Sequence, residues 1–262
     1  MPINTLVLNS VTKTFDEFKA LDNLNLTVPQ GCVFGLIGPN GAGKTTTINC
    51  IADLIHIDAG QIAIFGRSLQ SDGILVKKKM GILHENVDEL FVYLKGQEHL
   101  EFVGQIYGLS KATMFQRIDD LFDFFEMASH RYILIDDYSK GMKKKIALAS
   151  ILLHDPEFII LDEPFEGLDT ITMVKVKNLL KKLKANGKTV LLTSHILAFI
   201  EDLCDYIAII HQGKIVYENN TDKIRSEVTK KISKNSEFSG LEELLLNIVE
   251  NENDHEKRLD WI

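Results

Sequence analysis

The sequence predicts an α/β fold with a mainly parallel sheet, and three observations predict it. Short apolar runs alternate with helical patterns between residues 158 and 210, which is typical of a parallel sheet with helices on its faces. The first third of the chain instead consists of short β-like runs separated by turn residues. The middle third contains three successive helical patterns. The 262 residues are enough for one large domain with added subdomains.

Each element follows from its local pattern. The first third is expected to contain strands at 6–11, 24–28, 32–37 and 61–65 and a helix at 45–55, and to include an N-terminal antiparallel β subdomain. Apolar residues at helical spacing predict helices at 97–107, 111–127 and 140–153, and these form an inserted α-helical subdomain of about 86–154. Strands follow at 158–161, 189–193 and 206–210, with helices at 171–184 and 197–203.

These elements divide the chain into two parts. Residues 1–220 are expected to form one enzymatic domain, and residues 221–262 a C-terminal helical extension without an assigned role. The pattern LEELLLNIV predicts a short helix at 241–249 in that extension.

Composition excludes several classes of function. The net charge of −8 argues against nucleic acid as a partner. No stretch approaches the roughly 18 apolar residues that a membrane span needs, and the N-terminus shows no signal sequence. Cys32, Cys50 and Cys204 are far apart and are expected to be small buried residues in a reducing compartment. The chain is therefore expected to be cytoplasmic, and any membrane role requires docking onto another protein.

A glycine-rich segment between a predicted strand and a predicted helix fits the phosphate-binding pattern GxxxxGK(S/T). It comprises Gly38, Pro39, Asn40, Gly41, Ala42, Gly43, Lys44 and Thr45, and Thr46 follows in the helix. Glycines let backbone N–H groups turn toward phosphate oxygens, and the helix N-terminus adds partial positive charge. Lys44 is expected to neutralise the β- and γ-phosphates of ATP, and the Thr45 hydroxyl to ligate Mg²⁺. The pattern in this context predicts a P-loop NTPase core.

Two acidic residues follow a buried strand. Asp162 and Glu163 come directly after FIIL, and the carboxyl end of a parallel strand is where ligands bind in open α/β sheets. Asp162 is expected to hold Mg²⁺ through water, and Glu163 to act as the general base on the attacking water. By itself the pair would suit a solvated turn; with the phosphate loop upstream, the catalytic interpretation is favoured.

Further motifs resemble the ABC transporter ATP-binding subunits. YSKGM at 138–142 resembles the signature usually written LSGGQ, PFEGLD at 164–169 resembles the D-loop, and His195 ends a strand as the switch histidine does. The resemblance covers residues 6–217 with every motif in family order.

The resemblance implies a head-to-tail pair of subunits, a homodimer or a paired second subunit, with two ATP molecules between them. Ser139 and Gly141 would contact the γ-phosphate bound to the partner, and His195 would contact the γ-phosphate bound to its own subunit. Asp169 would help to join the two sites. Phe15 lies where the family stacks an aromatic ring on adenine, although plain core packing is an open alternative. A lysine face at 143–145 and another at 77–79 are expected to be solvated.

The sequence departs from the family at two motifs. Glu85 stands where the family has the Q-loop glutamine, and is expected to be a further Mg²⁺ ligand that adds negative charge. Lys140 and Met142 replace Gly and Gln in the signature, and Lys140 either points to solvent or adds positive charge near ATP. YSKGM and the segments around Glu85 and 94–109 resemble exporter ATPases of drug and bacteriocin efflux. These work with an integral-membrane permease, expected to seat near 85–94, and place the subunit on the inner face of the membrane. The alternative is a non-transport ATPase acting on ribosomes or DNA.

Overall fold

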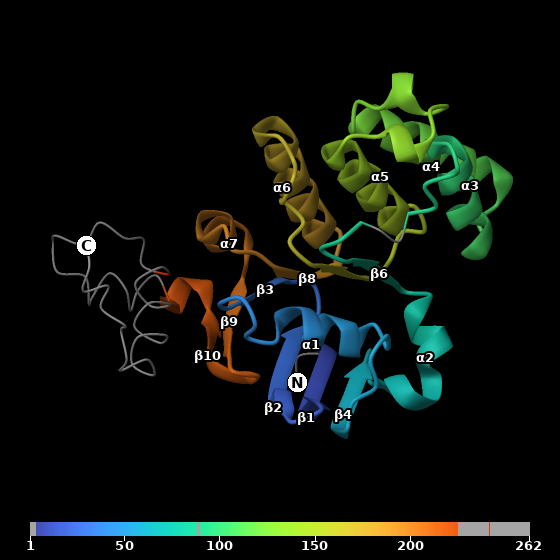
Figure 1. Ribbon diagram of the computed structural model, residues 1–262. Helices are drawn as coiled ribbons and strands as arrows, with labels where there is room; N and C mark the ends of the chain where they lie inside the picture. The colour runs from blue at the N-terminus through green and yellow to red at the C-terminus, as the bar shows by residue number, and fades with distance from the viewer. Residues whose placement is uncertain (1–3, 88–89, 225–240, 242–262) are drawn as a thin grey trace, which may run out of the picture.

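The computed structural model describes residues 4–87, 90–224 and 241 (Figure 1). Its strands are β1 Asn4–Phe15, β2 Phe18–Pro29, β3 Val33–Ile37, β4 Ala59–Ile64, β5 Arg67–Ser68, β6 Met80–Leu83, β7 Phe158–Leu161, β8 Thr189–Thr193, β9 Tyr206–His211 and β10 Lys214–Asn220. Its helices are α1 Lys44–Ile51, α2 Leu69–Lys77, α3 Gly96–Ile106, α4 Lys111–Phe124, α5 Lys140–Leu152, α6 Thr170–Ala185 and α7 Leu197–Leu203, with 3₁₀ turns at Ala128–His130 and Ile135–Asp137.

Two sheets form the framework. The larger has the strand order β10-β9-β3-β8-β7-β6, and its pairs are parallel except for the edge strand β10. The smaller has the order β2-β1-β4-β5 and is antiparallel throughout. Helix α1 lies between the two sheets, and α5, α6 and α7 cover the other face of the parallel sheet (Figure 1). The predicted α/β class, with a mainly parallel sheet and an N-terminal antiparallel β part, is confirmed.

Alternation along the parallel strands divides the core into two layers. On β7, Ile159 and Leu161 pack toward the helices α3 to α7, whereas Phe158 and Ile160 pack toward α1 and the antiparallel sheet. All four side chains are fully buried, because a strand covered on both faces has no solvated side. The central strand β3 is buried in the same way. The carboxyl ends of these strands therefore stand on a rigid support.

The three predicted middle helices are present and pack on one another as α3, α4 and α5, with α5 also contacting β6. Helix α4 ends at Phe124, three residues earlier than predicted, because Glu126 has a positive φ of 57° that an α-helix cannot continue through. Neither α2 nor the strands β6 and β10 were predicted.

Three further expectations concern composition and the C-terminus. Cys32, Cys50 and Cys204 are buried free thiols, as predicted. Within the described residues, no helix is long and apolar enough to cross a membrane. The predicted helix at 241–249 lies outside the described residues except for Leu241, which is buried and donates its backbone N–H to Glu201 Oε1 at 3.0 Å.

Candidate functional site

Four parallel strands bring the predicted residues to one edge of the sheet. The phosphate loop follows β3, Glu85 follows β6, Asp162 and Glu163 follow β7, and His195 follows β8. Because β3, β8, β7 and β6 are neighbours in that order, their carboxyl ends meet at one edge, where open α/β sheets bind ligands. The residues surround a cavity of about 730 Å³.

The phosphate loop depends on glycine where the backbone approaches other elements closely. A Cβ on Gly38 would lie 2.2 Å from the Ile210 carbonyl oxygen on β9, so no other residue fits there. Gly43 caps α1 with φ of 109°, a left-handed conformation that L side chains rarely adopt. Gly41, Gly43, Lys44 and Thr45 line the cavity at the N-terminus of α1, where a helix offers N–H groups to an anion such as phosphate.

Lys44 is held inside this loop. Its Nζ donates to the carbonyl oxygens of Gly38 at 2.7 Å and of Pro39 at 3.0 Å. Burial lowers the pKa of Lys44, while the negative charges of nearby carboxylates act in the opposite direction. An anionic phosphate in the cavity would give this partly desolvated ammonium a stronger partner than neutral carbonyl groups.

Thr193 joins the two acidic residues, a role that was not predicted from the sequence. Its hydroxyl donates to Asp162 Oδ1 at 2.5 Å and accepts the backbone N–H of Glu163 at 3.0 Å. Thr193 and Asp162 are buried, and Glu163 nearly so. Glu163 has φ of +46°, which is unusual for a residue other than glycine. One side chain on β8 therefore holds both the Asp162 carboxylate and the Glu163 main chain after β7.

Glu163 also contacts the predicted switch histidine. His195 Nδ1 lies 2.9 Å from Glu163 Oε2, and the His195 backbone N–H donates to the same oxygen at 3.3 Å. The His195 side chain is 64% exposed and that of Glu163 only 10%. The imidazole thus connects the buried carboxylate with the open side of the cavity.

The residues fit a bound Mg²⁺. Asp162 Oδ2 is buried and finds no hydrogen-bond partner among the described residues, which leaves a carboxylate oxygen free to face a cation or its water. Thr45 and Glu85 line the same cavity. The described residues contain no group of three or more His, Cys, Asp or Glu side chains suited to a metal.

Most predicted residues line this cavity, but some do not. The lining includes Phe15, Asn40, Gly41, Gly43, Lys44, Thr45, Thr46, Glu85, Asp162, Glu163 and His195. Phe18, Ala20 and Glu166 line it as well and were not predicted. Phe15 is 42% exposed, so the core-packing alternative is wrong for this side chain. Phe18 pairs with it across the β1–β2 turn, a proximity that the spacing FDEF could have revealed.

The signature residues Ser139 and Gly141 and the D-loop residue Asp169 are not among the residues that line this cavity, although Glu166 of the D-loop is. Ser139 caps α5, and its Oγ accepts from the Met142 N–H at 3.2 Å. A Cβ on Gly141 would lie 3.0 Å from the Gly167 carbonyl oxygen, so the two motifs are in close contact. Asp169 caps α6, and its two hydrogen bonds from Thr172 lower its pKa to about 2. These residues do not meet the phosphate loop of their own chain.

The lysines of α5 differ from the expectation. Lys144 is only 3% exposed, so its assignment to a solvated face is wrong. It faces inward because its Nζ reaches the Glu85 carbonyl oxygen at 3.2 Å. Lys140 does point to solvent, where it forms an ion pair with Glu166 at 2.8 Å. The second lysine face, 77–79, is exposed as predicted.

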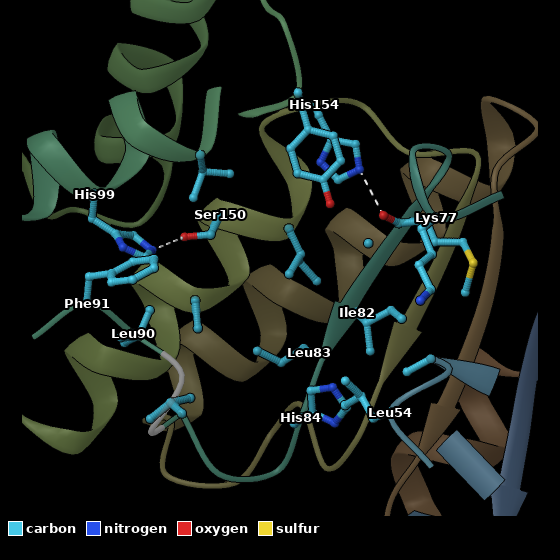
Figure 2. Close-up of a pocket in the computed structure, with 18 of the residues that line it drawn as sticks. Leu54, Lys77, Ile82, Leu83, His84, Leu90, Phe91, His99, Ser150 and His154 are labelled. Atoms are coloured by element: carbon cyan, nitrogen blue, oxygen red, sulfur yellow. Dashed lines mark hydrogen bonds between the residues drawn. The ribbon is translucent and has the colours of Figure 1, made fainter. Parts of the chain in front are cut away.

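A second, mostly apolar cavity of about 430 Å³ lies between β6 and the helices α3 and α5 (Figure 2). In its wall, His99 from α3 meets Ser150 from α5, with His99 Nε2 2.9 Å from Ser150 Oγ. Ser150 donates to the Ile146 carbonyl, so His99 Nε2 carries the proton. Burial lowers the pKa of His99 to about 4. His154 stacks on Tyr107 with ring centroids 3.7 Å apart.

The fold and the first cavity define a nucleotide-binding ATPase of the P-loop class. Comparison with known proteins specifies it further: the family described as ABC transporter matches residues 21–166. The chain belongs to this family, and its function is that of an ABC transporter ATP-binding subunit.

Three relatives illustrate the similarity. The chain is 34% identical over 206 residues to the ABC transporter ATP-binding protein NatA of Bacillus subtilis, covering 79% of this chain and 84% of NatA. It is 36% identical over 221 residues to the bacitracin transport ATP-binding protein BcrA of Bacillus licheniformis, covering 84% and 71%. It is 33% identical over 220 residues to the Nod factor export ATP-binding protein I of Burkholderia lata, covering 83% and 71%. The relatives favour transport over the ribosome or DNA alternative.

Solved structures agree. An ATP-binding subunit of an ABC transporter superposes with a TM-score of 0.85 at 30% identity, covering 94% of this chain and 99% of that one. The dimeric post-hydrolysis state of the ATP-binding cassette MJ0796, bound to ADP and Pi, superposes with a TM-score of 0.75 at 26% identity, covering 82% and 98%.

Proposed function

We propose that this chain binds and hydrolyses ATP in a head-to-tail dimer, formed by two copies or with a paired ATP-binding subunit, and powers a separate integral-membrane permease. The observation that carries the proposal is the convergence of Lys44, Asp162 and the Glu163–His195 pair around one cavity. This cavity holds a phosphate loop, a free carboxylate oxygen for Mg²⁺ and a carboxylate positioned as a base.

Within one chain, each residue has a proposed role. Phe15 stacks on adenine, and the loop from Gly38 to Thr46 surrounds the phosphates. Thr45, Asp162 and Glu85 would hold Mg²⁺, which when bound offsets phosphate charge and polarises the transferred group. Glu163 accepts the proton of the attacking water, and His195 connects that carboxylate to the γ-phosphate.

The dimer accounts for the residues outside the cavity. Ser139 and Gly141 stand at the N-terminus of α5, where a helix offers N–H groups to an anion. They do not reach the phosphate loop of their own chain, so a partner's ATP is the ligand that they fit. Asp169, next to this surface at the start of α6, would take part in the contact between subunits.

The second cavity is the proposed permease site. Its lining includes Asn86 and Phe91 from the predicted docking segment 85–94, together with the preceding residue His84. The apolar side chains Leu54, Phe91 and Tyr107 are exposed at its lining (Figure 2 labels the first two), as suits an apolar partner segment. We place the subunit in the cytoplasm, against the inner face of the membrane through the permease, and favour export because the motifs 85–109 and YSKGM resemble exporters.

We also propose the domain division expected from sequence. Residues 1–220 form the ATPase domain, with 86–154 as its helical subdomain, and 221–262 form an extension of unknown role. The mutual packing of α3, α4 and α5 supports the helical subdomain.

The decisive variant is Glu163→Gln, which keeps the shape of the side chain and removes the base. A general base contributes roughly 10²- to 10⁴-fold, so kcat should fall by at least about a hundredfold while ATP binding persists. The variant should also run as an ATP-dependent dimer on gel filtration. Unchanged turnover would exclude Glu163 as the base. Lys182→Met, an exposed change on α6, is the matched control and should keep wild-type turnover.

A further inference from the structure

The nucleotide cavity contains an excess of negative charge. Its lining includes four carboxylates, those of Glu85, Asp162, Glu163 and Glu166. Among its described lining residues, Lys44 is the one lysine or arginine. ATP is itself an anion, and Glu85 adds a charge where related subunits have a neutral glutamine. Positive charge near these carboxylates, beyond that of Lys44, would therefore favour binding of an anion.

Lys144 is a buried lysine that contacts the main chain of Glu85. It is in the second turn of α5, is 3% exposed, and donates from Nζ to the Glu85 carbonyl oxygen at 3.2 Å. A buried ammonium is costly unless opposite charges and hydrogen bonds compensate it. Burial lowers the pKa of Lys144, and all four carboxylates of the cavity oppose that change by favouring the charged form. The lysine and the acidic lining thus stabilise each other.

The hydrogen bond to Glu85 also restrains the 84–87 loop, which borders both cavities. Glu85 lines the nucleotide cavity, whereas His84, Asn86 and Val87 line the apolar cavity on the other side. Because the hydrogen bond is to the main chain, it restrains the loop itself and not only one side chain. The position of the Glu85 carboxylate relative to the phosphates therefore depends on Lys144.

We propose that Lys144 is a positioning residue for ATP binding: its ammonium holds the 84–87 loop by the Glu85 carbonyl and offsets the carboxylate charge that Glu85 adds. This inference rests on the proposed ATP site. Arginine at 144 would keep both the charge and the donor, whereas methionine would keep only the apolar stem.

The test measures the Kd of a non-hydrolysable ATP analogue with Mg²⁺ by titration calorimetry, and the unfolding midpoint of each variant. Lys144→Met should weaken binding about tenfold, and Lys144→Arg should stay within about threefold of wild type. In a Glu85→Gln background, Lys144→Met should weaken binding by no more than about threefold, because a neutral side chain at 85 removes both the charge that Lys144 offsets and the repulsion that a displaced carboxylate would exert on the phosphates. Lys182→Met controls for loss of a surface charge and should leave the Kd unchanged.

Each outcome decides the matter. A Kd effect of Lys144→Met that Glu85→Gln relieves and Lys144→Arg avoids supports the proposal. An equal effect in both backgrounds, or a lower unfolding midpoint without a change in Kd, overturns it and leaves a packing role. Wild-type protein that does not bind the analogue at all would instead refute the proposed ATP site.

Discussion

Thr193→Val tests the geometry of the acidic pair most directly. The substitution keeps the size and branching of the side chain and removes the hydroxyl that joins Asp162 Oδ1 to the Glu163 N–H. Both partners would then keep a buried polar atom without that bond. A hydrogen bond to a charged group contributes about 1.5–3 kcal/mol, and an unsatisfied buried amide costs about 1–3 kcal/mol. We therefore expect the free energy of unfolding to fall by about 2.5–6 kcal/mol.

Turnover should fall as well, because displacement of a catalytic group by about 1 Å can cost roughly a hundredfold. Urea unfolding followed by circular dichroism gives the stability, and phosphate release gives kcat. Thr193→Ser keeps the hydroxyl and loses one methyl group, so it should cost about 1 kcal/mol and retain turnover.

Thr189→Val separates folding from catalysis. Thr189 is equally buried at the other end of β8, where its hydroxyl contacts Thr5 and the Gly31 N–H. This variant should lose stability and keep kcat. A kcat of Thr193→Val within about threefold of wild type would be too small a change for a displaced base. That result would show that Thr193 does not position Asp162 and Glu163.

Two further predictions concern single side chains. Phe15→Ala should raise the Kd of ATP about fivefold at unchanged kcat, since stacking contributes on the order of 1 kcal/mol, and Phe15→Tyr should bind as wild type; equal Kd values for all three would exclude stacking. His99 has a pKa of about 4 against an ordinary 6.5, so below pH 6.5 the unfolded chain binds a proton that the native state refuses, and stability should fall by up to about 3 kcal/mol as pH drops to 4. In His99→Gln, the free energy of unfolding measured with urea should fall less steeply as the pH drops over that range, whereas the exposed variant His56→Gln should keep the wild-type pH dependence. The same pH dependence in His99→Gln as in the wild type would show that the pKa of His99 is not lowered.

Site residues could be predicted from the sequence when the residues that define their role are close together along the chain. The phosphate loop and the Asp162–Glu163 pair are contiguous motifs, so their arrival at one edge of a parallel sheet could be predicted. Thr193 could not, because its role depends on β8 lying beside β7. Lys144 was misassigned for the same reason: three consecutive lysines look equivalent until the Glu85 loop is placed against α5.

The strands β6 and β10 were not predicted because their local sequences lack the features of a typical strand. β6 is four residues long and includes Gly81, which disfavours strand assignment. β10 is a partly exposed edge strand with a polar end, KIVYENN, and so lacks the apolar run of a central strand. The ends of helices were off by up to three or four residues because capping conformations, such as that of Glu126, are set by the turn that follows.

The 84–87 loop connects the two halves of the proposed function. Glu85 lines the nucleotide cavity, and its neighbours His84, Asn86 and Val87 line the apolar cavity. The Glu85 carbonyl is bonded to Lys144 on α5, the helix whose N-terminus carries Ser139. A permease segment entering the apolar cavity would therefore contact the same loop that places Glu85 near the phosphates. Movement of α5 toward a partner's ATP would pull on that loop through Lys144. In this chain, the hydrogen bond from Lys144 to the Glu85 carbonyl would thus link α5 to the loop in which Glu85 replaces the expected glutamine.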